Sequence, residues 1–385
     1  METVALAPFK VVIDGIKEAG GEAFKFCYQC GKCDTVCPWN RVRKFFLRRM
    51  INQAHLGVVP FESEDIWLCA TCRNCVQRCP RGVEIIDVMR AMRRLLVPDG
   101  VVPASIPNLR SVMTSFASVG NPWGQEPKDR ANWAKGLGLK EFGEGTELLY
   151  FPCCYPSYDP RLKKVAQATA NILNKAGVDF GILGPKESCC GESVRKAGNE
   201  ELFRRLAREN IKTYIENGVK RILASSPHCY HTFKNEYPEF KVNFEVVHIS
   251  QYLFELINEG RLKLTKEYGK KVTYHDPCYL GRHNGIYDEP REALKNVPGL
   301  ELIEMAESRE DSLCCGMGGG RIWMETAKGE RFSDLRLEQA IGVGAEVLAT
   351  SCPYCITQFE DSRLTLKDSE VIKIMDITEI FQEVI

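Results

Sequence analysis

Residues 146–385 show two alternating patterns of hydrophobic and polar positions. The short apolar runs include LLYF, VDFGIL, KRILASS and FEVVHI, and the longer amphipathic stretches include PRLKKVAQATANILNKAG and NEELFRRLARENIKTYIENG. Short apolar runs rich in β-branched residues predict buried strands, and apolar positions three or four residues apart predict helices. We therefore expect an α/β fold built on parallel strands in this part of the chain.

The pattern occurs twice. YFPCC at 150–154 matches YHDPC at 274–278, CysCysGly at 189–191 matches 314–316, and SSPHC at 225–229 matches SCPYC at 351–355. A duplication of about 120 residues predicts two similar α/β lobes that face each other across a pseudo-twofold axis. We call residues 146–269 the first lobe and residues 270–385 the second lobe.

The part before the lobes reads differently. Residues 1–97 contain helical stretches such as RVRKFFLRRMINQAHLG between cysteine-rich segments. Residues 98–145 contain five prolines and seven glycines, which predict an extended connector without a long helix or strand. The expected fold class is multidomain, α+β and α/β: a helical module, a connector and two lobes.

Composition narrows the function. The 385 residues include 51 basic and 51 acidic side chains, so no overall positive charge favours nucleic acid. The chain has no apolar run long enough to span a membrane, and its first residues do not resemble a signal peptide. We expect a cytoplasmic protein that reaches a membrane only through a partner.

Eighteen cysteines suggest metal or redox chemistry in a reducing compartment. Cys-x2-Cys-x2-Cys-x3-Cys-Pro occurs twice within residues 27–80, as in bacterial ferredoxins, where each run gives its fourth cysteine to the other cluster. The module 1–97 is therefore predicted to hold two cubane 4Fe-4S clusters. The predicted ligands of cluster one are Cys27, Cys30, Cys33 and Cys79, and those of cluster two are Cys69, Cys72, Cys75 and Cys37.

The alternative for these runs is a pair of structural zinc sites. Zinc takes four ligands in two pairs, and that pattern does not explain three-plus-one spacing followed by proline. Residues 25–94 contain 13 basic and 6 acidic side chains. A solvated basic face is the usual meaning of such an excess, but guanidinium groups near anionic clusters would also stabilise their reduced form.

The second lobe repeats a plan of cysteines after successive strands. Parallel strands place such residues at one edge of the sheet, where α/β folds bind ligands. Five thiolates exceed what one cubane or one zinc needs, which favours an assembly in which one sulfur bridges irons. The candidate ligands and reacting groups are Cys278, Cys314, Cys315, Cys352 and Cys355. Gly316, Gly318 and Gly319 in the GMGGG run would let backbone N–H groups approach sulfide or a substrate anion.

The first lobe departs from this plan at one position. Its matching cysteines are Cys154, Cys189, Cys190 and Cys229, but Ser226 stands where the second lobe has Cys352. With Cys153, the first lobe still has five cysteines near its predicted site. Three outcomes stay open for this lobe: a cluster that uses Cys153, a simpler cluster, or none.

With its ferredoxin runs, its DIWLCATC segment and its paired CysCysGly lobes, the chain resembles the heterodisulfide reductase family, and within it the D subunit. This resemblance implies a noncubane 4Fe-4S cluster on the five second-lobe cysteines, where a disulfide between two thiol coenzymes is cleaved. It also allows a second reading, because relatives with one incomplete lobe occur in sulfur-metabolism membrane complexes and as electron-transfer subunits of benzoyl-CoA reductase.

Two main functions therefore compete. In the first, the chain is an oxidoreductase subunit that passes electrons to the second-lobe site and reduces a disulfide, with His275 as the candidate proton donor. In the second, it is an electron relay without disulfide chemistry. A regulatory metal-binding module would not need so many clusters. The chain has no GxGxxG after a strand, so a flavoprotein or a membrane cytochrome b is the expected partner.

Overall fold

The computed structural model describes residues 8–97, 106–366 and 371–385. The chain packs as two units. The ferredoxin unit contains Met1–Arg110, Ser193–Leu202 and Gly316–Phe332, and the sheet unit contains Ser111–Glu192, Phe203–Cys315 and Ser333–Ile385. The domains expected from the sequence end at 97, 145 and 269. They assign the segments after the two cysteine pairs, 193–202 and 316–332, to the lobes, whereas both segments pack in the ferredoxin unit.

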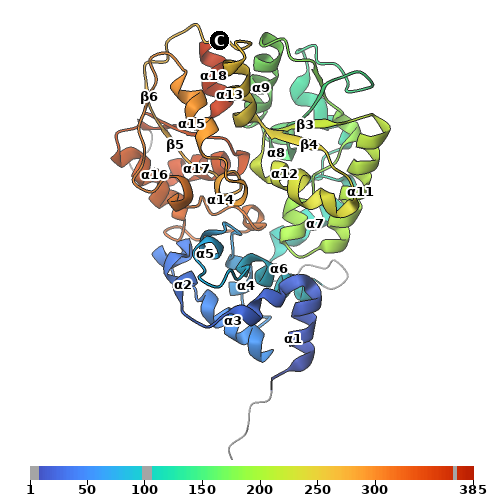
Figure 1. Cartoon of the computed structure of the whole chain (residues 1–385), viewed down its shortest axis with the longest axis vertical. Helices are drawn as coiled ribbons and strands as arrows, with labels where there is room; N and C mark the ends of the chain where they lie inside the picture. The colour runs from blue at the N-terminus through green and yellow to red at the C-terminus, as the bar shows by residue number, and fades with distance from the viewer. Residues whose placement is uncertain (1–7, 98–105, 367–370) are drawn as a thin grey trace, which may run out of the picture. The chain divides into compact units, whose positions relative to one another are not determined.

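The ferredoxin unit is built from short helices, as the sequence predicts. Its longest described helices bury apolar side chains, which include Ile51, Met89 and Met92. Glycine in a left-handed conformation at Gly57 ends the helix predicted between the two cysteine runs. The α-helices of the first 97 residues, coloured blue to teal in Figure 1, are α1 Lys10–Ile16, α2 Lys32–Val36, α3 Leu47–Leu56, α4 Asp65–Leu68, α5 Asn74–Gln77 and α6 Ile85–Leu96.

The sheet unit holds two four-stranded parallel sheets with the same strand order, β2-β1-β3-β4 and β6-β5-β7-β8. The predicted runs form these strands and the amphipathic stretches form the helices between them (Figure 1). The first lobe contains β1 Leu148–Phe151, α8 Cys154–Tyr158, α9 Lys163–Lys175, β2 Phe180–Gly181, α10 Glu192–Lys196, α11 Glu200–Glu216, β3 Arg221–Ala224, α12 Pro227–His231, β4 Glu245–His248 and α13 Ile249–Asn258.

The second lobe repeats this arrangement. It contains β5 Lys271–Tyr274, α14 Gly281–Asn284, α15 Asp288–Lys295, β6 Glu301–Leu302, α16 Phe332–Gly342, β7 Val347–Thr350, α17 Pro353–Thr365, β8 Lys373–Asp376 and α18 Ile377–Val384. Equal strand order confirms that the two lobes share a fold.

The lobes pack through equivalent helices. The first long helix of each lobe contacts the last helix of the other, so that α9 packs on α18 and α15 packs on α13. One apolar core joins the lobes and contains Tyr150, Leu253, Tyr274 and Phe381. These reciprocal contacts are what a pseudo-twofold axis requires.

The prediction of a connector without a long helix is wrong within residues 106–145. Helix α7 spans Pro107–Val119, and a 3-10 segment spans Pro127–Ala134. Both begin with a proline, whose fixed φ and missing N–H suit the first turn of a helix. The prolines thus mark helix starts here, and residues 98–105 lie outside the described residues.

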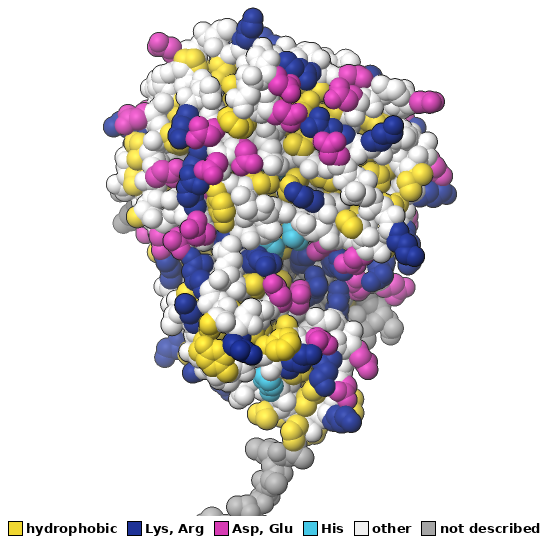
Figure 2. Space-filling view, viewed as in Figure 1, with side chains coloured by type: hydrophobic (Ala, Val, Ile, Leu, Met, Phe, Trp, Pro, Cys, Tyr) yellow, Lys and Arg dark blue, Asp and Glu magenta, His cyan; other side chains and the backbone are white. Residues whose placement is uncertain are grey.

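Charged side chains of both signs are interspersed over the face shown in Figure 2. This distribution agrees with the equal numbers of basic and acidic residues. Within the described residues, no helix has both the length and the apolar character needed to cross a membrane.

Candidate iron–sulfur sites

The two ferredoxin runs have the same backbone conformation. Gln29 and Gly31 have φ of 65° and 78°, and the matching Thr71 and Arg73 have φ of 50° and 66°. A β-branched residue such as threonine rarely adopts positive φ, and such strain is typical of functional sites. The turn conformation is therefore kept in both runs at an energetic cost.

The four predicted ligands of cluster two line one pocket in the ferredoxin unit. Its other walls are mostly apolar and include Phe45, Leu47, Ile86 and Phe332. Burial, followed by the proximity of the other thiolates, raises the pKa of Cys37 and of Cys75 well above the usual value. Iron binding would therefore release protons from these thiols. The surroundings of the pocket fit a desolvated cluster.

The cysteines of the predicted cluster one lie closer to solvent. Burial, with nearby Asp34 and Cys27, raises the pKa of Cys33 to about 12. The pKa of Tyr28 is raised by desolvation and by the charges of Cys30 and Cys79, which places those two cysteines near the same ring. Cys79 of the second run thus lies near Tyr28 and Cys30 of the first run, and the ligand set of cluster one stays a prediction.

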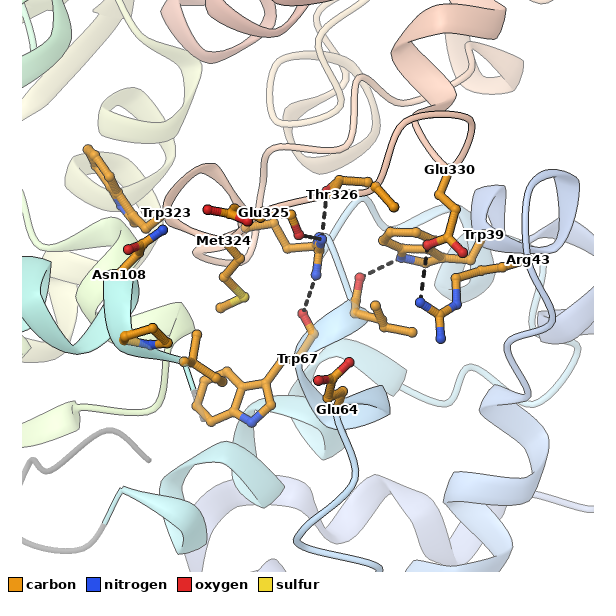
Figure 3. A pocket seen from close by; sticks show the side chains of 15 residues that line it. Trp39, Arg43, Glu64, Trp67, Asn108, Trp323, Met324, Glu325, Thr326 and Glu330 are labelled. Carbon is orange, nitrogen blue, oxygen red and sulfur yellow. Dashed lines mark hydrogen bonds and ion pairs between the residues drawn. The ribbon is translucent and has the colours of Figure 1, made fainter. Parts of the chain in front are cut away.

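A second, larger pocket in the ferredoxin unit adjoins cluster two (Figure 3). Its lining includes three indole rings, Trp39, Trp67 and Trp323. Trp39 also lines the pocket of the cluster-two cysteines, and its Nε1 donates to the carbonyl of Leu68 at 2.5 Å. Arg321 lies over the Trp39 ring at 4.8 Å, and burial lowers its pKa to about 10. The sequence did not indicate this pocket, which shares Trp39 with the pocket of the cluster-two cysteines.

In the second lobe the structure brings together Cys315, Cys355 and His275, whose ligand atoms all lie within 4.8 Å of one another. The sulfurs of Cys315 and Cys355 are 3.3 Å apart. Hydrogen bonds from Cys314, Cys355 and His275 lower the pKa of Cys315 well below its usual value. A buried thiolate is therefore available at this edge of the sheet.

Of the two further predicted ligands, Cys352 adjoins this group through its hydrogen bond with Cys355. Burial raises the pKa of Cys352, but hydrogen bonds from Cys355 and His228 outweigh it and lower this pKa to about 6. Cys278 is buried beyond β5, where its carbonyl accepts the His283 N–H at 3.1 Å. Among the described residues, the 4.8 Å group does not include Cys278.

His275 is oriented by a buried arginine. The Arg336 Nε donates to Nδ1 of His275 at 3.2 Å, so the imidazole proton belongs on Nε2 when the ring is neutral. Burial, and then the charge of Arg336, keep the pKa of His275 below its usual value. The neutral ring is thus held with its donor available to Cys315.

Gly318 and Gly319 of the GMGGG run pack within the ferredoxin unit. A Cβ on Gly318 would lie 2.3 Å from the Ala70 carbonyl oxygen, and one on Gly319 would lie 2.4 Å from that of Cys69. Close approach of two backbones explains why glycine stands at both positions. Anion binding by Gly316, Gly318 and Gly319 stays a prediction.

The five thiols of the first lobe also gather. The sulfurs of Cys190 and Cys229 are 3.4 Å apart, and Cys153 hydrogen-bonds to Cys229. Hydrogen bonds from Cys189 and Cys229 lower the pKa of Cys190 to about 7. The backbone φ of Cys153 is 79°, an uncommon value that turns this residue into the site. Ser226 is fully buried.

His228 of the first lobe reaches the second-lobe site. Its Nδ1 lies 3.0 Å from Glu192, and its ring stacks on Tyr279 at 4.1 Å. Burial disfavours its charge, but Glu192 and Cys352 outweigh burial and raise the pKa of His228 to about 10. The charged ring therefore donates toward Cys352 from across the lobe boundary.

Sequence patterns did not reveal the arginines around these sites. Arg130 donates to the Cys154 sulfur at 3.4 Å and pairs with Glu187 at 3.4 Å, although it lies in the predicted connector. Arg336 and His228 likewise contact residues of the sites from distant positions in the sequence. No regular spacing in the sequence connects these residues to the cysteines, because only the fold brings them together.

The comparisons with known proteins agree with this layout. Residues 148–234 and 272–360 match the cysteine-rich domain family known as CCG, and residues 23–83 match the 4Fe-4S dicluster domain. A hypothetical protein from Helicobacter pylori has a similar fold, with a TM-score of 0.58 and 10% identity over 97% of this chain and 76% of that one.

Three relatives are similar to this chain, and the one matched over nearly its full length shows the family. The probable iron-sulfur-binding oxidoreductase FadF of Bacillus subtilis is 41% identical over 86% of this chain, and the EtfAB:quinone oxidoreductase of Syntrophomonas wolfei is 39% identical over 83%. The chain covers only 48% and 46% of those two relatives. The D subunit of the dihydromethanophenazine:CoB–CoM heterodisulfide reductase of Methanosarcina mazei is 33% identical over 93% of each chain. The chain is therefore an iron–sulfur protein with a dicluster module and two CCG lobes, and it belongs to the oxidoreductase family of the heterodisulfide reductase D subunits.

Proposed function

We propose that the chain passes electrons from two cubane clusters in the ferredoxin unit to a noncubane 4Fe-4S cluster in the second lobe, where a disulfide is reduced. The observation that carries this proposal is the convergence of Cys314, Cys315, Cys352 and Cys355 with His275. The clusters would supply one-electron steps, and the reaction needs two electrons and two protons for each disulfide converted to two thiols.

Two histidines near the second-lobe cysteines would supply a proton for the reaction and offset the negative charge of the thiolates. His275, oriented by Arg336, holds a proton on Nε2 beside Cys315 and could give it to a departing thiolate. The His228–Glu192 pair places a cation near Cys352 and would partly offset the charge of the thiolates.

A partner is part of this proposal. Cys30 is exposed, and so are the neighbouring aromatic rings Phe26 and Tyr28, so cluster one would exchange electrons with a docked protein. We propose a flavoprotein or a membrane cytochrome b in this role, with the chain in the cytoplasm. The names of the relatives, which include a quinone oxidoreductase, favour a relay between redox partners as the second candidate function.

Acceptor specificity distinguishes the two functions. The anaerobic, iron-loaded chain would be reduced and mixed with the CoB–CoM heterodisulfide, which is in the name of the Methanosarcina mazei relative. Stoichiometric release of two thiols per disulfide supports reductase function. Re-oxidation by a water-soluble quinone together with no thiol release would support the relay and contradict disulfide reduction.

A further inference from the structure

Arg93 on α6 is the most buried arginine among the described residues of the ferredoxin unit, with 1% of its surface exposed. Its guanidinium donates to four backbone carbonyls. The acceptors are those of Ile66 at 3.0 Å, Cys69 at 2.9 Å, Lys196 at 3.0 Å and Gly319 at 2.7 Å. One permanently charged side chain therefore joins three separate segments of the sequence.

The three segments have related roles. Cys69 begins the cluster-two loop, Cys69–Cys75. Lys196 and Gly319 belong to the two segments that follow the CysCysGly motifs, 193–202 and 316–332, both of which pack in the ferredoxin unit. Gly316, the first residue of the second segment, is bonded directly to Cys315. Four peptide units thus separate Gly319 from a predicted ligand of the second-lobe site.

The backbones meet without intervening side chains. A Cβ on Gly319 would lie 2.4 Å from the Cys69 carbonyl oxygen, and a Cβ on Gly198 would lie 2.6 Å from the Arg93 carbonyl carbon. Gly319 has φ of 66°, a conformation that also favours glycine. Glycine at these positions therefore allows the 316–332 backbone to pack directly on the cluster-two loop and the 193–202 backbone to pack directly on α6.

We propose that Arg93 is a positioning residue for electron transfer, which holds the 316–320 backbone on the cluster-two loop so that electrons pass along this contact toward Cys315. The inference rests on the cluster assignments in the proposed function. Each step moves one electron from a reduced centre to an oxidised one, and no bond or proton changes. Either final acceptor, a disulfide or a redox partner, is compatible with it.

The test uses the whole iron-loaded chain without any acceptor. After one-electron photoreduction, freeze-quenched EPR follows the arrival of electrons at the second-lobe site. We expect Gly319→Ala and Arg93→Gln to keep both ferredoxin signals and to slow this arrival severalfold, because the rate of electron transfer falls steeply as the contact between the two backbones lengthens. Arg93→Lys keeps the charge and the donors of a single ammonium nitrogen, but not the planar fork that reaches four carbonyls, so it should restore part of the rate.

Matched controls separate positioning from stability. Arg90→Gln removes a cation on the same helix that pairs with Asp87 at 3.0 Å. Gly329→Ala adds a Cβ at another glycine of positive φ in the same segment, where nothing lies within 4 Å. Neither control should slow the transfer. Hydrogen exchange of the iron-loaded chain should show faster exchange across 316–320 in Arg93→Gln and not in Arg90→Gln.

Two results would overturn the proposal. One is an unchanged rate in Gly319→Ala with all clusters present, and the other is equal slowing in Gly319→Ala and Gly329→Ala. If Arg93→Gln fails to retain its clusters, the rates of electron arrival in Arg93→Lys, Gly319→Ala and Gly329→Ala test the proposal in its place. Because no acceptor is added, a failure of disulfide reduction leaves this outcome unaffected.

Discussion

Replacing single cysteines can show which of the two ferredoxin clusters each one binds. Cys37 belongs to the first run by sequence, yet it lines the pocket of Cys69, Cys72 and Cys75. We expect Cys37→Ala and Cys75→Ala to abolish the same cubane EPR signal, and Cys33→Ala to abolish the other. Cys190→Ala, in another unit, is the control that should leave both signals. Loss of the same signal in Cys37→Ala and Cys33→Ala would contradict the crossed pattern.

Cys153 is the residue on which the first lobe depends. Its contact with Cys229 supports its use in place of the thiolate missing at Ser226. We expect Cys153→Ala to lower the iron content by about one cluster and Ser226→Cys to add none. Both variants would be compared with wild type by iron and sulfide analysis under anaerobic conditions. A new noncubane EPR signal in Ser226→Cys, with Cys153→Ala unchanged, would show that Cys153 is not a ligand.

The repeated cysteine spacings predicted that Cys37 belongs with Cys69, Cys72 and Cys75, and these four line one pocket, although their roles as ligands stay a prediction. The same reasoning could not predict Arg93, Arg130 or Arg336. Each is a buried cation whose partners are separated from it by long stretches of sequence, and an arginine in a sequence resembles a solvated surface residue.

Two equivalent helix caps should respond to pH in opposite directions. His248 caps α13 and Asp376 caps α18, each accepting from the N–H two residues on. Burial lowers the pKa of His248 to about 3 and raises that of Asp376 to about 7. The native protein therefore holds a proton on Asp376 that the unfolded chain releases above its ordinary pKa. At His248, the unfolded chain takes up a proton that the native protein excludes.

The stability contributions follow from this difference. The Asp376 contribution is lost as pH rises toward about 7, and the His248 contribution is lost as pH falls below about 6.5, each on the order of a few kcal/mol. Relative to wild type, the melting temperature of Asp376→Asn should rise with pH between about 4 and 7, and that of His248→Asn should fall. Parallel slopes in the two variants would contradict the assignment.

At the scale of elements, hydrophobic periodicity predicted the strands and helices of both lobes, since the apolar runs became strands and the two central strands of each sheet are almost entirely buried. It did not predict α7, where proline content was taken to exclude a helix although Pro107 occupies the first position. It also did not predict that 193–202 and 316–332 would pack in the ferredoxin unit, because that depends on the backbone contact at Gly318 and Gly319.

The whole molecule makes a prediction about metal content. The ferredoxin unit should contribute about eight irons, and each lobe that assembles a cluster should add about four more. Inductively coupled plasma analysis of anaerobic wild-type protein, with sulfide determined in parallel, measures this directly. Zinc without iron in the ferredoxin unit would support the structural-zinc alternative and contradict the redox assignment.

The central claim is that reductive chemistry takes place in the second lobe. Cys315→Ala tests it most directly, with Cys190→Ala as the equivalent change in the first lobe. EPR and thiol release would be recorded on the assembled complex. The account predicts that Cys315→Ala loses the noncubane signal and disulfide turnover while both ferredoxin clusters remain reducible, and that Cys190→Ala retains turnover. Full turnover in Cys315→Ala would contradict it.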